Sequence, residues 1–163
     1  MAVKITKITD DNLNECIEIW NSVVMDGNAF PQLETLNMVT GKKFFDEQTY
    51  AGAAVETDTN EVAGVYILHP NNIGRCGHIC NASYAVKKEK RGLHIGEALV
   101  LDCMEKARQF GFKILQFNAV VKSNSAALRL YEKLGFIRLG TIPNGFYNKN
   151  GEYEDIIPHY KEL

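Results

Sequence analysis

The alternation of apolar and polar residues predicts a mixed order of helices and strands. The clearest pattern spans residues 92–110, where apolar residues recur at helical spacing and charged side chains take the opposite face. The predicted elements, in chain order, are strand 3–8, helix 11–25, helix 33–46, strands 50–57 and 61–69, strand 78–86, helix 92–110, strand 113–121, helix 125–134, strand 137–142 and strand 153–160. This order predicts an α/β (α+β) fold.

Two of the predicted helices have a well-defined buried face. In helix 11–25 this face carries Leu13, Cys16, Ile17, Trp20 and Val24. In helix 92–110 it comprises the apolar positions 96, 99, 100, 103, 104, 107 and 110. Each of these helices is therefore expected to bury one face.

Length and composition bound the class of protein. A chain of 163 residues with 45% hydrophobic content can fill one hydrophobic core but is too short for two domains, so a single domain covering residues 1–163 is expected. The net charge of −2 gives no overall basic field, which argues against nucleic acid as a partner. No apolar run is long enough for a signal peptide or a membrane span, which predicts a cytoplasmic protein that does not associate with a membrane.

The start of helix 92–110 predicts an anion-binding site. The first N–H groups of a helix have no intrahelical partner and lie at the positive end of the helix dipole, so here they can hold a phosphate or diphosphate. The segment is neither the dinucleotide fingerprint nor the nucleoside-triphosphate loop, and an ordinary glycine-rich helix entry is the alternative. The residues of this predicted cradle are Arg91, Gly92, Leu93, His94, Ile95, Gly96 and Glu97.

The next helix has recognisable start and stop signals. Ser123 or Asn124 can cap its first turn, and Gly135 suits the left-handed residue after its end. Its predicted inner face carries Ala127, Leu130, Tyr131 and Leu134.

These two segments together resemble the Gcn5-related N-acetyltransferase (GNAT) family, over roughly residues 78–143. The family's cofactor loop reads [QR]-x-x-G-x-[GA], and His94 stands here where glycine is usual. A weaker similarity to phosphinothricin-type acetyltransferases includes Trp20 and Asn21. The later family element reads N-x-x-A-x-x-L-Y-x-K-x-G-F and is matched by Asn124, Ala127, Leu130, Tyr131, Lys133, Gly135 and Phe136.

The resemblance implies a fold, a cofactor and residue roles. The implied GNAT fold has a mixed, mostly antiparallel central sheet, splayed between two strands and flanked by about four helices. The implied cofactor is acetyl-CoA, whose pantetheine arm would contact the backbone of Tyr84, Ala85 and Val86 and the side chain of Asn124. Tyr131 aligns with the family's tyrosine acid, which protonates the departing thiolate; a partly buried core aromatic is the alternative.

The base that deprotonates the acceptor amine is not identified by the sequence. Where related small-amine acetyltransferases often carry Glu, this chain has Asn81, which can orient a water but cannot take a proton. The substitutes that remain open are His78, Glu34, Asp26 and Asp155.

Two loops supply candidate contacts to the acceptor substrate. Gly27 and Pro31 interrupt helix formation and leave Phe30 and Gln32 free to face a pocket, although Phe30 as a core plug is an equal alternative. In segment 140–151, two Asn-Gly pairs predict tight turns between the last strands. Its candidate contacts are Asn144 and Phe146, with Tyr147 and Tyr153 nearby, and ordinary turn chemistry is the alternative.

The predicted function is transfer of an acetyl group from acetyl-CoA to a primary amine of a small molecule. A non-catalytic acyl-CoA-binding module and a peptide or protein N-terminal acetyltransferase are the alternatives, and the resemblance allows a homodimer. No metal is expected. Cys76, His78 and Cys80 alternate along a predicted strand, but a zinc site needs a fourth ligand at recognisable spacing.

Overall fold

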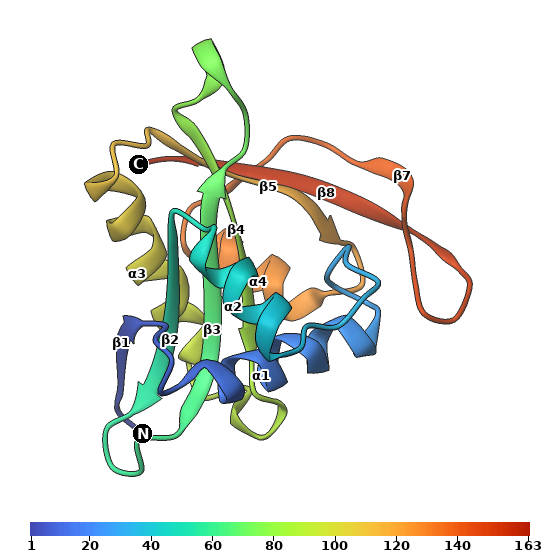
Figure 1. The fold of residues 1–163 in the computed structure, drawn as a ribbon. Coiled ribbons are helices and arrows are strands. Elements are labelled where there is room, and N and C mark those ends of the chain that lie inside the picture. Colours follow the sequence, from blue (N-terminus) through green and yellow to red (C-terminus); the bar gives the residue numbers. More distant parts are fainter.

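The computed structural model describes residues 1–163, which form one eight-stranded sheet with helices on both faces (Figure 1). The strands are β1 (Val3–Lys7), β2 (Tyr50–Glu56), β3 (Val62–Pro70), β4 (Ile79–Val86), β5 (Ile114–Val121), β6 (Ile137–Arg138), β7 (Ile142–Tyr147) and β8 (Tyr153–Glu162). The helices are α1 (Leu13–Asp26), α2 (Met38–Asp46), α3 (Ile95–Gln109) and α4 (Ser125–Lys133), with short 3₁₀ turns η1 (Gly74–Cys76) and η2 (Lys88–Lys90).

The sheet order is β1-β2-β3-β4-β5-β8-β6, and β7 also pairs with β8. All pairs are antiparallel except β4 with β5. The mixed, mostly antiparallel sheet with four helices confirms the predicted fold class. No helix combines the length and apolar character that a membrane crossing requires.

The two faces of the sheet bury separate cores because successive strand residues point to opposite sides. On β3, Val65 and Ile67 pack with α1 and α2, whereas Tyr66 and Leu68 pack with α3. Figure 1 shows α1 and α2 in front of the sheet and α3 along its other side. All five residues predicted for the inner face of α1 are buried.

The one parallel junction positions the site. Strands β4 and β5 pair only at Ile79 with Ile114 and at Cys80 with Leu115, and no further pair follows along either strand. The pairing of β4 with β3, by contrast, continues to Val86. The β5-facing edge of β4 therefore has no strand partner after Cys80, which is the predicted splay.

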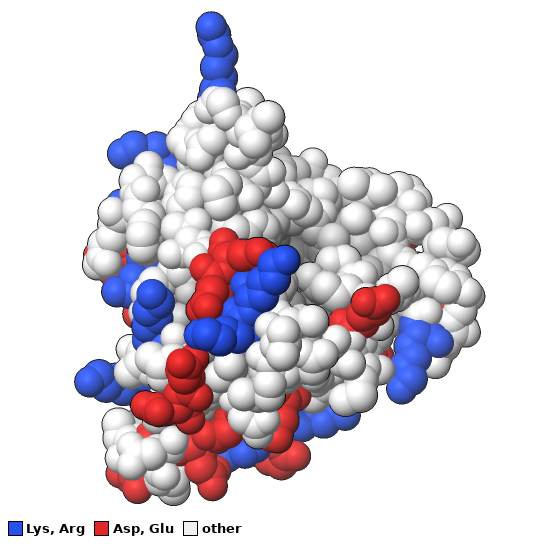
Figure 2. Space-filling view, in the orientation of Figure 1, with Lys and Arg blue, Asp and Glu red and all other residues white.

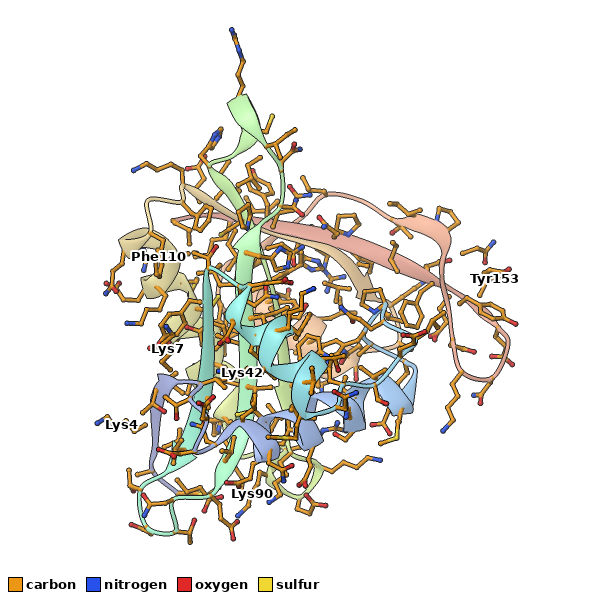
Figure 3. All side chains as sticks on the ribbon, viewed as in Figure 1. Lys4, Lys7, Lys42, Lys90, Phe110 and Tyr153 are labelled. Atoms are coloured by element: carbon orange, nitrogen blue, oxygen red, sulfur yellow. The ribbon has the colours of Figure 1, made fainter.

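Three helices begin later than predicted: α1 begins at Leu13 instead of residue 11, and two others differ by three residues or more. Helix 33–46 begins only at Met38, because the Asn37 side chain accepts hydrogen bonds from the N–H groups of Val39 and Thr40 and so caps the helix there. Helix 92–110 begins at Ile95, because His94 takes a left-handed conformation with φ 60°. At its other end, Phe110 lies beyond the helix and is 52% exposed, not buried as predicted (Figure 3).

The prediction for the last strands was partly wrong. Strand 137–142 is only the two-residue β6, and Asn144 and Gly145 lie within β7 instead of forming a tight turn. Asn144 has φ 54°, and the register of β7 against β8 shifts between Ile142 and Phe146, so this Asn-Gly pair marks an irregularity in a strand. The second pair precedes β8, and Gly151 has the positive φ of 79° expected in the connecting turn.

Candidate active site

Two adjoining cavities open where β4 and β5 separate. The larger, of about 670 Å³, lies between β4, the start of α3 and α4. The smaller, of about 290 Å³, lies between β3, β4 and β5 and the segment after α1. Residues that line both are Ala29, Tyr84, Asn124, Ala127 and Tyr131. Tyr131 and Asn124 therefore mark the passage from one cavity to the other.

The larger cavity contains the predicted anion cradle. The backbone N–H groups from Gly92 to Glu97 donate no hydrogen bond, and the first donor of α3 is the N–H of Ala98, which binds the His94 carbonyl at 3.1 Å. A Cβ built on Gly92 would meet nothing within 4 Å, so the space beside these amides is open. Six free donors at a helix start fit the diphosphate of coenzyme A.

Carboxylates pair with the cations around this cradle. Asp26, at the end of α1, lies 3.1 Å from Lys88 Nζ and 3.8 Å from Arg91. Lys133 Nζ donates to Glu97 at 2.7 Å, and this hydrogen bond is the main cause that lowers the pKa of the Glu97 carboxyl group. A bound diphosphate would therefore compete with Asp26 for Arg91.

His94 is strained in its backbone and free in its side chain. Its φ of 60° is a conformation that favours glycine, and its side chain is 82% exposed, with one long contact of 3.4 Å to Glu97. Glycine would adopt this backbone conformation without strain.

We expect His94→Gly to raise the stability of the protein by about 0.5–1 kcal/mol, because relief of the left-handed strain exceeds the entropy that glycine adds to the unfolded chain. Thermal unfolding measures this, with His94→Ala as the control that keeps the strain and removes the imidazole. The affinity for acetyl-CoA, measured by calorimetry, should differ less than threefold between each variant and the unaltered protein. A large loss of affinity in both variants would instead show that the imidazole contacts the cofactor.

The free edge of β4 supplies further backbone groups. Lys87 N–H binds the Ala63 carbonyl at 2.9 Å and Asn71 N–H binds the Ile79 carbonyl at 2.8 Å, so the odd-numbered residues of β4 face β3. Because antiparallel strands alternate, the N–H and C=O groups of Ala82, Tyr84 and Val86 face the gap toward β5. Of the predicted pantetheine contacts, Tyr84 and Val86 have free backbone groups, while Ala85 pairs with Val65.

Asn124 caps α4 and faces both cavities. Its Oδ1 accepts a hydrogen bond from Ala127 N–H at 3.3 Å, which confirms the predicted cap. The side-chain amide nitrogen is then left to donate to a ligand between β4 and α4.

Tyr131 stands in an aromatic setting at the junction of the cavities. Its ring centroid lies 4.4 Å from that of Phe117 and 5.4 Å from that of Phe136. Burial, with a smaller contribution from Cys103, raises the pKa of the phenol well above its usual value, so the group keeps its proton at neutral pH. This is the protonation state that a proton donor needs.

His159, on β8, supports Tyr131 and carried no signal in the sequence. Its ring lies edge-on to Tyr131 with centroids 5.8 Å apart, and the side chain is 1% exposed. Nδ1–H donates to the Ile157 carbonyl at 2.7 Å, and burial is the main cause that lowers the pKa of the imidazole. A neutral His159 therefore helps to hold the Tyr131 ring in place.

The smaller cavity contains Asn81 together with an unpredicted histidine. Asn81 of β4 and His69 of β3 are register partners, and both line the cavity. His69 Nδ1 lies 2.9 Å from the Pro70 carbonyl, an arrangement in which Nδ1–H donates and Nε2 is left as the acceptor nitrogen. His69 thus presents a free ring nitrogen beside Asn81, and no local sequence pattern indicates this because only the β3–β4 register brings the two residues together.

None of the four substitutes considered for the base lines the smaller cavity. Asp26 faces Lys88 and Arg91, and Asp155 accepts from the N–H of Asn144 at 3.1 Å. His78 and Glu34 are exposed.

The predicted acceptor contacts divide into two groups. Phe30 and Gln32 line the smaller cavity, and Phe30 also packs against Trp20 with ring centroids 4.4 Å apart, so it is both a core residue and part of the cavity wall. Asn144 and Phe146 line neither cavity: Asn144 is exposed, and Phe146 is buried with Val121 and Ile156.

The two tyrosines near the hairpin turn also lie outside the cavities. Tyr147 and Tyr153 are 61% and 65% exposed, and their rings lie 4.9 Å apart. Figure 3 shows Tyr153 on the outer side of the β7–β8 hairpin.

The alternating cysteines do not share a strand face. Cys76 lies in η1 and is exposed, whereas Cys80 is buried in β4, where its thiol donates to the Ile114 carbonyl at 3.2 Å. No group of three or more His, Cys, Asp or Glu side chains is arranged to hold a metal ion.

The comparison with protein families agrees with this geometry. Residues 15–136 match the acetyltransferase (GNAT) family. The chain therefore belongs to the GNAT family, a class of N-acetyltransferases that use acetyl-CoA, and the family assignment made from the sequence is confirmed.

Individual relatives extend the likeness. N-acetyltransferase aca1 of Schizosaccharomyces pombe is 37% identical over 92 residues, which cover 56% of this chain and 44% of that protein. The matches span 18% to 59% of the length of three curated relatives.

Solved structures match over nearly the whole chain. A GCN5-related N-acetyltransferase from Kribbella flavida has 26% identity and a TM-score of 0.90, over 99% of this chain and 98% of that one. A phosphinothricin acetyltransferase from Sinorhizobium meliloti, solved with acetyl-CoA, has 18% identity and a TM-score of 0.90, over 100% and 89% of the two chains. At that identity the second match shows a shared fold.

Proposed function

We propose that this chain transfers the acetyl group of acetyl-CoA to a primary amine of a small molecule. The observation that carries the proposal is the junction of the two cavities at Tyr131: one cavity ends in free helix-start amides, and the other is a small chamber beside the same phenol. A chamber of about 290 Å³ suits a small acceptor better than a protein surface.

Acetyl-CoA, when bound, supplies a thioester whose carbonyl carbon is attacked and whose sulfur leaves. The N–H groups from Gly92 to Glu97 bind the diphosphate, and the free edge of β4 pairs with the pantetheine arm. The N–H of Ala82 or Tyr84, both in the smaller cavity, donates to the developing oxyanion.

Proton transfers fall to side chains at the junction. Tyr131 lines both cavities and, as a phenol that is protonated at neutral pH, donates its proton to the departing thiolate. On the acceptor side, His69 Nε2 and Asn81 order a water that receives the proton of the attacking amine.

Calorimetry and thiol release test the proposal together. We expect acetyl-CoA to bind saturably well below millimolar concentration, and acetyl-pantetheine, which lacks the diphosphate, to bind at least tenfold more weakly. A panel of primary amines should yield amine-dependent release of free thiol.

Two results would contradict the proposal in different ways. If a folded sample binds no acetyl-CoA at millimolar concentration, the proposed cofactor site is wrong. Normal uptake without thiol release for any amine favours the non-catalytic acyl-CoA-binding module instead.

A further inference from the structure

Four of the polar side chains that line the smaller cavity are carboxamides. Gln32 comes from the segment between α1 and α2, Asn81 from β4, Asn118 from β5 and Asn124 from the cap of α4. The other walls are mostly apolar, among them Phe30. Four amide side chains from four different elements converge on a chamber that is large enough for one small molecule.

Gln32 presents an acceptor that nothing in the chain satisfies. Its Oε1 is shielded from solvent and has no hydrogen-bond partner, although Gln32 lines the cavity. A buried carbonyl oxygen without a donor is unfavourable, so a ligand N–H at this place is strongly favoured.

A second set of amides is held in a defined orientation by hydrogen bonds to one another. Asn118 Nδ2 donates to Asn71 Oδ1 at 2.7 Å, and Asn71 Nδ2 donates back to Asn118 Oδ1 at 3.2 Å. Gln116 Nε2 adds a bond to Asn118 Oδ1 at 3.0 Å, and Asn81 Nδ2 lies 3.5 Å from Asn71 Oδ1. These bonds fix the amides and leave the Asn81 carbonyl oxygen without a donor.

No carboxylate, Lys or Arg lines this cavity. Its titratable side chains are His69 of β3, Tyr84 of β4 and Tyr131 of α4. On the face seen in Figure 2, charged side chains gather over β1, α1 and α2, whereas mostly uncharged atoms cover the side of β5 and β8. The cavity therefore has no negative charge to attract an alkylammonium ion and no cation to hold a carboxylate.

We infer that the acceptor is an α-amino amide, a primary amine next to an uncharged carboxamide, which Gln32 and Asn81 recognise by amide-to-amide hydrogen bonds. This inference rests on the proposed function and names its substrate class. A free amino-acid amide and the N-terminus of a short peptide share this chemistry.

The basicity of the amine supports the same class. An alkylamine has a reference pKa near 10.4, so at pH 7 about one molecule in 2500 is unprotonated. An α-amine has a reference pKa near 7.8, so at the same pH about one molecule in seven is unprotonated. Without a carboxylate to bind the ammonium ion, the cavity must admit the neutral amine, so the α-amine has an advantage of about 300-fold in available nucleophile.

A matched set of acceptors tests the inference by thiol release: L-leucinamide, L-leucine and 3-methylbutylamine, which is leucinamide without its carboxamide. We expect kcat/KM to be at least 100-fold higher for leucinamide than for either of the others at pH 7. The ratio of kcat/KM for leucinamide to kcat/KM for 3-methylbutylamine should fall about 14-fold between pH 7 and pH 9, because the alkylamine loses its proton over this range. The tripeptide amide Leu-Gly-Gly-NH₂ distinguishes a peptide N-terminus from a free amino-acid amide. Slower turnover of the tripeptide amide than of leucinamide would identify the free amino-acid amide as the acceptor.

Gln32→Glu tests the cavity directly, because it places a carboxylate where the unsatisfied oxygen lies. We expect the preference for leucinamide over 3-methylbutylamine to fall at least tenfold. Gln109→Glu on the exposed end of α3, where Lys106 lies 3.5 Å away, makes the same chemical change outside both cavities and should leave the preference unaltered.

Other outcomes would overturn the inference. Free leucine or 3-methylbutylamine matching leucinamide at pH 7 would contradict it, and so would an unchanged preference in Gln32→Glu. Either result leaves acetyl transfer intact, whereas failure of thiol release with every amine contradicts the proposed function itself.

Discussion

Tyr131→Phe should lower kcat by about 100-fold or more while acetyl-CoA affinity changes little, because the substitution removes a proton donor and keeps the ring. The phenyl ring still packs on Phe117 and Phe136. Steady-state thiol release with saturating amine gives kcat, and calorimetry gives the affinity.

The matched control for this prediction is Tyr50→Phe. Tyr50 lies on β2 against Tyr66 and lines neither cavity, so the same loss of a hydroxyl group should leave kcat within twofold. If Tyr131→Phe turns over at the rate of the unaltered protein, Tyr131 has no part in proton transfer and a water must protonate the thiolate.

Trp20→Ala should lower the free energy of unfolding by about 3–5 kcal/mol, because it leaves a large cavity in a close-packed core. Trp20 is 1% exposed, and its ring contacts Phe30, Phe44 and Phe45 at centroid distances of 4.4 to 6.1 Å. For a domain of this size the melting temperature should drop by about 6–20 °C.

Trp20→Phe is the control for that prediction, since it keeps an aromatic ring in the site and should lose less than half as much stability. Because Trp20 also supports Phe30, a wall of the acceptor cavity, we expect Trp20→Ala to raise KM for the amine as well. Equal stability of both variants would show that the core closes around the missing ring.

The parts of the site that follow local rules were predictable from the sequence. The capping residue Asn124, the stop at Gly135 and the free amides before α3 depend on neighbours a few positions away, and each occupies its predicted place. Phe30 and Gln32 line the smaller cavity, where regular helix is interrupted around Gly27 and Pro31, and their contact with the acceptor stays a prediction.

The rest depends on contacts between distant residues. His69 reaches the site only because β3 and β4 pair in a register that sets it opposite Asn81. His159 meets Tyr131 only because β8 crosses beside β5. Asn144 carries an Asn-Gly turn signal, yet pairing with β8 extends β7 through it. No local pattern reports a strand's neighbours, so these positions had no sequence signal.

The parallel junction of β4 and β5 has a consequence for how the protein holds together. Only two residue pairs join the strands, so the halves of the sheet on either side of this seam share few backbone bonds. A pantetheine arm along β4 would act as an extra strand filling the seam. Ligand that binds only the folded state stabilises it by mass action, so the free energy of unfolding rises with the concentration of the acetyl donor.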